Sequence, residues 1–156
     1  MDSRKQLLLI DDEVIVRRML ASFLEPYFKV QIAADAFETI ALLFGLNAQQ
    51  LPSEFDQLQK YITRYSRQFE GRIHHHSILK ICPDIIIADI KMPKINGFQL
   101  VHILRKYLPT VPVFMITGFE DEGYDHEVSR LKINEILAKP FSPMILLEKI
   151  KKIMHI

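Results

Sequence analysis

Residues 84–97 read DIIIADIKMPKING, and this stretch decides the fold. Its first half is short, apolar and mostly branched at Cβ. The apolar residues are continuous rather than alternating, which is typical of a strand buried on both faces of a parallel sheet. The run ends on a carboxylate, Asp89. The stretch therefore predicts a buried strand that places an acidic side chain at one edge of a sheet.

Similar apolar runs recur on both sides of this strand, with stretches of helical spacing between them. The expected strands, of which the second is the weakest, are Gln6–Ile10, Lys29–Ala33, Asp84–Ala88, Val111–Ile116 and Glu135–Ala138. The expected helices are Val14–Leu24, Ala36–Leu46, Phe98–Leu108, Asp121–Leu131 and Ser142–Met154. Regular alternation of strand and helix predicts βαβ units in a parallel, doubly wound α/β sheet.

Length and composition narrow the class of protein. A chain of 156 residues fits one domain, so we expect a single domain over residues 1–156. The net charge of +1 provides no basic field for direct nucleic-acid binding. No apolar stretch approaches the ~20 residues of a membrane span, so we expect a cytoplasmic protein without a membrane partner. The single cysteine, Cys82, cannot form an internal disulfide, and we expect it to be buried.

One segment interrupts the alternation. Between the second helix and the strand at Asp84 lie about forty residues, whereas such connections usually take about 2 to 6. We therefore expect a folded insertion over about residues 46–80. Spacings of four and three predict a helix over about residues 52–70 that packs along another helix, with this apolar face: Leu51, Phe55, Leu58, Ile62, Tyr65 and Phe69. This face could be buried on the domain itself, or in a contact with a partner or a second copy. The sequence leaves both alternatives open.

Each of the four strong strand runs leads into an acidic residue, a threonine or a lysine. The carboxyl ends of parallel strands share one edge of the sheet, where ligands bind, so we expect these side chains to converge. A helix cap would explain any one of them. Lys139 is different, because it precedes a predicted helix start, where a cation is disfavoured unless an anion is near. Three acids, a hydroxyl and a lysine describe a site for a hard cation and a phosphoryl group: Asp11, Asp12, Asp89, Thr117 and Lys139.

Taken in order, these motifs resemble the signature of two-component response-regulator receiver domains. The resemblance covers nearly the whole chain except about residues 46–80. It implies a single-domain receiver with a flavodoxin-like parallel sheet of five strands in the order 2-1-3-4-5, and an extra helical insertion. The residues that carry it are Asp11-Asp12, Asp89-Ile-Lys-Met-Pro93 with Asn96-Gly97, Thr117-Gly118 and Lys139-Pro140-Phe141.

The resemblance also implies roles for these residues. Asp89 would accept a phosphoryl group from a phosphohistidine donor, and Thr117 and Lys139 would bind the phosphoryl oxygens. The peptide bond between Lys139 and Pro140 would be cis. A Mg²⁺ ion would be held by Asp11, Asp12, Asp89 and the backbone carbonyl of Lys91.

A receiver of this kind implies protein partners and no enzyme activity beyond its own phosphorylation and dephosphorylation. The donor would be a sensor histidine kinase or a histidine phosphotransfer protein, and the output a contact with a downstream protein effector. A homodimer could form through the insertion. It could also form through the face of the fourth regular helix, the fifth strand and the fifth regular helix.

One position departs from the family, and two other functions compete. Receivers usually carry an aromatic residue three positions before the lysine, but this chain has Ile136, so the usual aromatic switch is in question. A phosphohydrolase of the haloacid dehalogenase type also uses an Asp nucleophile, a Thr or Ser and a Lys. It needs a second Asp two residues after the nucleophile, where this chain has Lys91. A docking receiver that no longer accepts phosphate is opposed by the presence of every acceptor-site residue.

Overall fold

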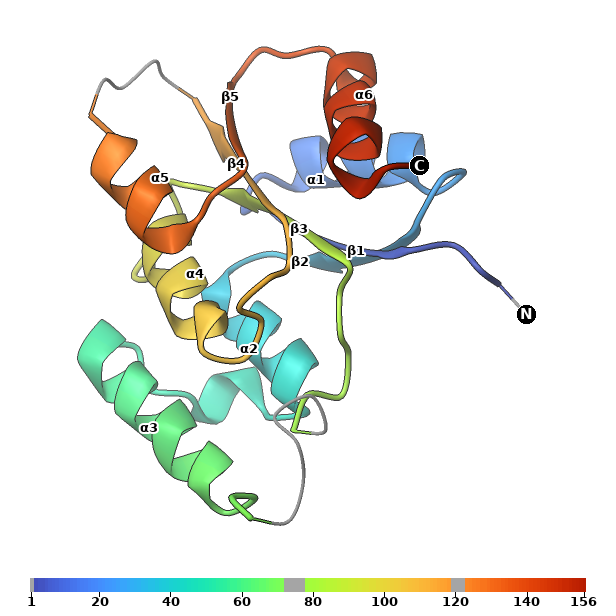
Figure 1. Ribbon diagram of the computed structural model, residues 1–156. Coiled ribbons are helices and arrows are strands. Elements are labelled where there is room, and N and C mark those ends of the chain that lie inside the picture. Colours follow the sequence, from blue (N-terminus) through green and yellow to red (C-terminus); the bar gives the residue numbers. More distant parts are fainter. Residues whose placement is uncertain (1, 72–77, 119–122) are drawn as a thin grey trace.

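The computed structural model describes residues 2–71, 78–118 and 123–156, and its centre is a parallel sheet. Five strands pair in the order β2-β1-β3-β4-β5, which confirms the predicted fold class and strand order. Figure 1 shows the twisted sheet between two layers of helices. The strands are β1 (Gln6–Ile10), β2 (Lys29–Ala33), β3 (Ile85–Asp89), β4 (Val113–Thr117) and β5 (Glu135–Ala138).

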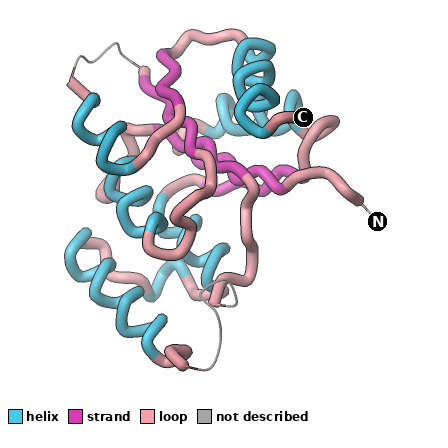
Figure 2. Tube along the Cα trace, in the orientation of Figure 1, coloured by secondary structure: helices cyan, strands magenta, loops and turns pink. Residues whose placement is uncertain are grey.

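Helices cover both faces of the sheet, as a doubly wound fold requires (Figure 2). One face is covered by α1 (Val14–Leu24) and α6 (Pro143–Met154). The other is covered by α2 (Ala36–Phe44), α4 (Gly97–Arg105) and α5 (Asp125–Leu131). In β3, Ile86 and Ala88 pack in the core beneath α2, α4 and α5. Ile85 and Ile87 pack in the core beneath α1 and α6. Burial on both faces is therefore the reason that this strand is continuously apolar.

Local signals set the helix ends near the positions expected from the sequence. Gly45 adopts a left-handed φ of 68° and ends α2 two residues before the predicted end at Leu46. Asn96 begins α4 with a capping box, in which its side chain and that of Gln99 each accept a backbone N–H. The expected helix start at Asp121 lies outside the described residues.

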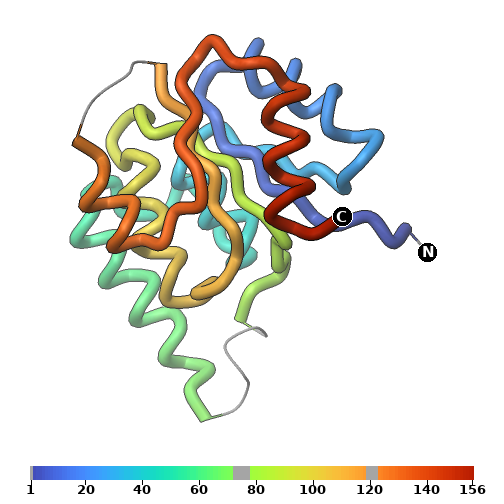
Figure 3. The backbone as a smooth tube through the Cα atoms, turned by 45° about the horizontal axis from the view of Figure 1, so that its top comes forward, coloured from blue at the N-terminus to red at the C-terminus, as the bar shows by residue number. Residues whose placement is uncertain are grey.

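The insertion contains a short 3-10 turn, Ala48–Gln50, and the helix α3 (Phe55–Arg67). Figure 3 shows α3 beside α4, on the side of α4 that faces away from the sheet. Leu58 and Ile62 are buried in the same core as α2 and α4, and the neighbouring aromatic residues pack against it. The predicted helix is confirmed, although it is three residues shorter at each end than the predicted 52–70 and leaves Leu51 and Phe69 outside it. Its apolar face is covered by the chain itself.

Polar and aromatic contacts fix α3 on its neighbours. The Tyr107 hydroxyl donates to Ser66 Oγ over 3.1 Å, and both residues are buried. The Tyr65 hydroxyl donates to the carbonyl of Phe44 over 3.4 Å, and the two rings meet edge-on at 6.3 Å. These contacts join α3 to the end of α2 and to the segment that follows α4.

Two further expectations concern single features. Cys82 is exposed, so the prediction that it is buried was wrong: it lies in the irregular segment before β3 and not within the strand. Among the residues that the structure describes, no helix combines the length and apolar character needed to cross a membrane.

Candidate functional site

The register of the sheet brings the acidic residues together. Parallel pairing of β1 with β3 sets Ile10 opposite Ala88, so the next residues along, Asp11 and Asp89, lie at the same level of the sheet edge. Asp11 is fully buried and Asp89 is 4% exposed, whereas Asp12 is exposed. Oxygens of the three carboxylates lie within 4.8 Å of one another.

The hydroxyl and the lysine reach this edge from the other half of the sheet. Thr117, which is buried, ends β4 and pairs with Ala138 at the end of β5. Lys139 follows directly, and its N–H donates to the Thr117 carbonyl over 2.7 Å. The peptide bond between Lys139 and Pro140 is cis, as expected. All five predicted side chains thus belong to the carboxyl ends of adjacent strands.

The Lys139 ammonium lies among three carboxylates. Its Nζ is 3.3 Å from Asp11 Oδ2 and 3.5 Å from Asp89 Oδ2. Its shortest contact, 2.8 Å, is to Oε1 of the exposed Glu13, which the sequence prediction did not include in the site. Glu13 directly follows the acid pair in the sequence, and that adjacency was the available signal for its role. The lysine therefore partly neutralises the cluster.

Burial and mutual repulsion change the protonation of these groups. Burial raises the pKa of Asp89 to about 6, although the nearby Lys139 ammonium opposes the change; the charges of Asp11 and Asp12 add to it. Burial likewise raises the pKa of Asp11. For Lys139, burial alone would lower the pKa, but the hydrogen bond to Glu13 and the surrounding carboxylates raise it. The site holds more negative charge than one lysine can neutralise.

The donor set fits a hard divalent cation. Oδ1 of Asp11 accepts the Glu13 N–H over 2.8 Å, but Oδ2, which is buried, has no hydrogen-bond donor in suitable geometry. The Lys139 ammonium faces this oxygen at 3.3 Å and forms an ion pair with it. Asp89 Oδ1 accepts the Lys91 N–H over 3.2 Å, which fixes the loop after β3 against the acceptor carboxylate. Carboxylate oxygens of this kind are preferred ligands of Mg²⁺.

A glycine allows the next helix to begin against the acceptor strand. A Cβ atom at Gly97 would lie 2.2 Å from the Asp89 carbonyl oxygen and 2.6 Å from Met115 Cε. The Gly97 N–H donates to the Ile90 carbonyl over 2.8 Å. Only glycine permits this approach, so the start of α4 is in direct contact with the backbone of Asp89.

Two further residues near the site are Ile136, which was singled out from the sequence, and Arg17, which was not. Ile136, at the position where the family usually has an aromatic residue, is half-buried and packs against the core that α4 and α5 share. Arg17 was not predicted, but its Nη1 donates to the Asp11 carbonyl over 2.6 Å. This contact fixes the loop that carries the acid pair, and no spacing in the sequence pointed to it.

Comparisons with known proteins agree with this geometry. A family model described as the response regulator receiver domain matches residues 56–151, more than half of the chain. The chain is 30% identical over 141 residues to the response regulator Rre1 of Synechocystis sp., covering 88% of this chain and 46% of that protein. It is 27% identical over 154 residues to the transcriptional regulatory protein DegU of Brevibacillus brevis, covering 96% of this chain and 50% of that one. The chain spans about half the length of these curated relatives.

Solved structures show the same fold. The chemotaxis response regulator CheY4 of Vibrio cholerae superposes with a TM-score of 0.66 at 23% identity, covering 97% of this chain and 99% of that one. A CheY-like receiver domain protein of Methanospirillum hungatei JF-1 gives a TM-score of 0.70 at 22% identity, with 98% and 95% covered. At these identities the likeness concerns the fold.

Proposed function

Because this chain belongs to the family of response regulator receiver domains, which act in two-component signal transduction, we propose that it accepts a phosphoryl group on Asp89. The single observation that carries the proposal is the position of Lys139 Nζ, 3.5 Å from Asp89 Oδ2 at the shared edge of the sheet. In this proposal residues 1–156 form one receiver domain, with an insertion over about residues 46–80.

Each residue has a distinct part in the proposed reaction. An oxygen of the Asp89 carboxylate attacks phosphorus, the bond from phosphorus to the donor nitrogen breaks, and an acyl phosphate forms. The Lys139 ammonium binds one phosphoryl oxygen, because its pKa is raised and it stays protonated. The Thr117 hydroxyl, on the strand beside β3, donates to another. Positioning and charge stabilisation carry most of the catalysis in such transfers.

The acid cluster supports a requirement for Mg²⁺. Asp11, Asp12 and Asp89 would hold the ion, with the backbone carbonyl of Lys91 as a further ligand. When bound, Mg²⁺ supplies charge that neutralises the carboxylates and the phosphoryl oxygens. The buried Oδ2 of Asp11, which faces the crevice 3.3 Å from the Lys139 ammonium, supports this assignment.

The surface beside the crevice supports a protein as phosphodonor. Val14, Ile15 and Met19 are 48%, 83% and 52% exposed, and they lie on α1, which begins two residues after the acid pair. Exposed apolar residues next to a reactive site are typical of a protein contact. We assign this contact to a sensor histidine kinase or a histidine phosphotransfer protein, and the output to a downstream protein effector. Self-association through α3 has less support, because Leu58 and Ile62 are already buried.

The hydrolase alternative has no support from the geometry. Lys91, where such an enzyme would need its second Asp, is exposed, and its backbone N–H contacts Asp89. A lysine cannot replace an aspartate there as the general acid and base of hydrolysis. A phosphorylated Asp89 would therefore persist as a signal rather than lose its phosphoryl group rapidly.

Phosphorylation by a small donor tests the proposal directly. Purified chain is incubated with acetyl phosphate, with Mg²⁺ or with EDTA, and intact mass is recorded for the wild type and Asp89→Asn. We expect one phosphoryl group on the wild type only, and only with Mg²⁺, because the acid cluster repels an anion until a cation neutralises it. Equal uptake by Asp89→Asn would exclude Asp89 as the acceptor. Equal uptake in EDTA would exclude the metal requirement.

A further inference from the structure

Helix α4 lies between α3 and α5, and His102 of α4 contacts both. The Gln59 amide of α3 is 3.1 Å from His102 Nε2, and Arg130 Nη1 of α5 is 2.9 Å from His102 Nδ1. A hollow of about 520 Å³ runs along α3 and is lined in part by Gln59. A second, of about 260 Å³, is lined by residues of α3, α4 and α5 including His102. Gln59, which lines the first hollow, contacts His102, which lines the second, and we call the two hollows together the α3–α5 groove.

The contacts of His102 fix the floor of this groove. Arg130 can only donate a hydrogen bond, so His102 Nδ1 must accept it. The Gln59 side-chain nitrogen lies 3.1 Å from the other ring nitrogen of His102, Nε2. The His102 ring thus connects the inserted helix to α5.

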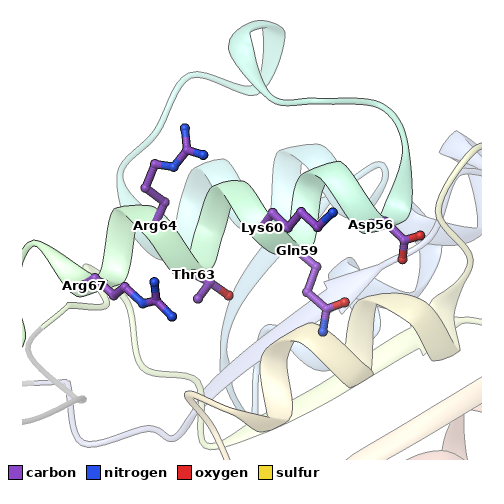
Figure 4. Close-up of a pocket in the computed structure, with 6 residues that line it drawn as sticks. All are labelled: Asp56, Gln59, Lys60, Thr63, Arg64 and Arg67. Atoms are coloured by element: carbon purple, nitrogen blue, oxygen red, sulfur yellow. The ribbon is translucent and has the colours of Figure 1, made fainter.

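The α3 side of the groove carries unpaired positive charge. Lys60, Arg64 and Arg67 follow one another along the outer surface of α3 and are exposed (Figure 4). Within the part of the chain that the structure describes, none of the three forms an ion pair. Lys60 and Arg64 are four residues apart, a spacing at which like charges destabilise an isolated helix slightly. Their charge is available to an outside group.

We propose that the α3–α5 groove is a docking surface for an acidic amphipathic helix of a protein partner. Carboxylates of such a helix would pair with Lys60 and Arg64, and its apolar side would meet Phe55, which is partly exposed and lines the second hollow. A shallow groove formed by helices is a common seat for an amphipathic helix. A nucleic acid fits less well, because Asp56 and Glu127 line the same groove.

The groove is also connected to the proposed acceptor. Its floor is α4, whose first residue, Gly97, is in contact with the backbone of Asp89. A partner in the groove would therefore contact the helix that begins at the phosphorylation site. Docking itself rests on the charges and shape of the groove, and not on phosphate acceptance.

Fluorescence anisotropy with defined probes tests the proposal. The probes are a labelled amphipathic peptide with Glu on one face and Leu on the other, the same peptide with Lys in place of Glu, and a single-stranded oligonucleotide. The groove variant is Lys60→Glu with Arg64→Glu. Its matched control is Arg18→Glu with Lys152→Glu, which reverses one Arg and one Lys, equally exposed, on α1 and α6.

We expect the wild type to bind the Glu peptide in preference to the Lys peptide. The groove variant should weaken that binding about tenfold or more, and the control about twofold at most. Absence of Glu-peptide binding to the wild type, equal loss in both variants, or tighter binding of the oligonucleotide at the same residues would overturn the proposal. Uptake of phosphate from acetyl phosphate, measured on the same samples, should be equal in the variants, which separates this proposal from that of the acceptor role.

Discussion

The carboxyl edge of the sheet and the inserted helix α3 place charge in opposite ways. At the edge, Asp11 and Asp89 are buried beside each other with one lysine between them. On α3 Leu58 and Ile62 are buried, and the charged residues are exposed. Burial of like charges costs free energy, whereas burial of apolar side chains stabilises the fold. The edge is therefore arranged for chemistry, and α3 contributes packing and an outer surface.

Helix α4 connects these two regions. Its first residue contacts the backbone of Asp89. Further along, His102 contacts α3, and so does Tyr107, which lies just beyond the end of α4. Substitutions at the sheet edge and substitutions on α3 should therefore have different effects. A change at the edge should alter the chemistry, and a change in the buried face of α3 should alter stability alone.

The largest effect is expected where α4 begins. Gly97→Ala places a Cβ atom within 2.2 Å of the Asp89 carbonyl oxygen, which is backbone and cannot move independently. We expect a loss of about 3 kcal/mol in the free energy of unfolding, measured by urea titration, together with impaired phosphate uptake. Gly118→Ala is the control, because a Cβ there meets no atom of the described residues within 4 Å. Equal stability of the two variants would show that α4 can shift away from the acceptor strand.

The next effect concerns α3. Ile62, which is 1% exposed, lies in the shared core, and Ile62→Ala should lower the free energy of unfolding by about 2 to 3 kcal/mol. Tyr61→Ala, the exposed neighbour on the same helix, should change it by less than about 0.5 kcal/mol. Phosphate uptake by folded Ile62→Ala should match that of the wild type. A stability loss confined to a separate early transition would mean that the insertion unfolds independently of the sheet.

The sequence predicted the fold almost completely, for identifiable physical reasons. Every strand of the sheet was found within two residues, because strands buried on both faces are continuously apolar. The α3 helix was found because its burial requires apolar residues at a spacing of three and four. The end of α2 was predicted two residues late, since its apolar pattern continues through Leu46 whereas Gly45 ends the helix. Cys82 was misjudged because neighbouring apolar residues do not define burial outside a regular element.

The candidate site was predictable in its members but not in its contacts. Strand ends identify the acids, Thr117 and Lys139, because parallel topology alone brings strand ends to one edge. The pairing of Lys139 with Glu13 depends on the direction of two long side chains, and no periodic pattern encodes that. The buried hydrogen bond from Tyr107 to Ser66 could not be predicted either, because a serine within an amphipathic helix is expected to be exposed.

That buried bond gives a smaller effect on the α3 side. Tyr107→Phe removes the hydroxyl that donates to Ser66 Oγ over 3.1 Å, and should lower the free energy of unfolding by about 1 kcal/mol. Ser66→Ala should cost a similar amount. The double variant, measured by urea titration, should cost less than the sum of the two, because both single changes break the same bond. Strict additivity would show that the hydroxyl contributes nothing through Ser66.

The smallest effect is expected at the lysine. Glu13 is exposed, so its ion pair with Lys139 adds little stability, and Glu13→Gln should change the free energy of unfolding by less than about 0.5 kcal/mol. The same change removes one negative charge beside the path of an incoming phosphodonor and releases one of the three donors of the Lys139 ammonium. Uptake of phosphate from acetyl phosphate at saturating Mg²⁺ should therefore become about two- to threefold faster, within the range expected for loss of one screened charge. Glu38→Gln, an exposed acid on α2, serves as the control and should leave the rate unchanged. Slower uptake by Glu13→Gln would mean that Glu13 holds the ammonium in the position needed for transfer, and that its repulsion of the donor is the lesser effect.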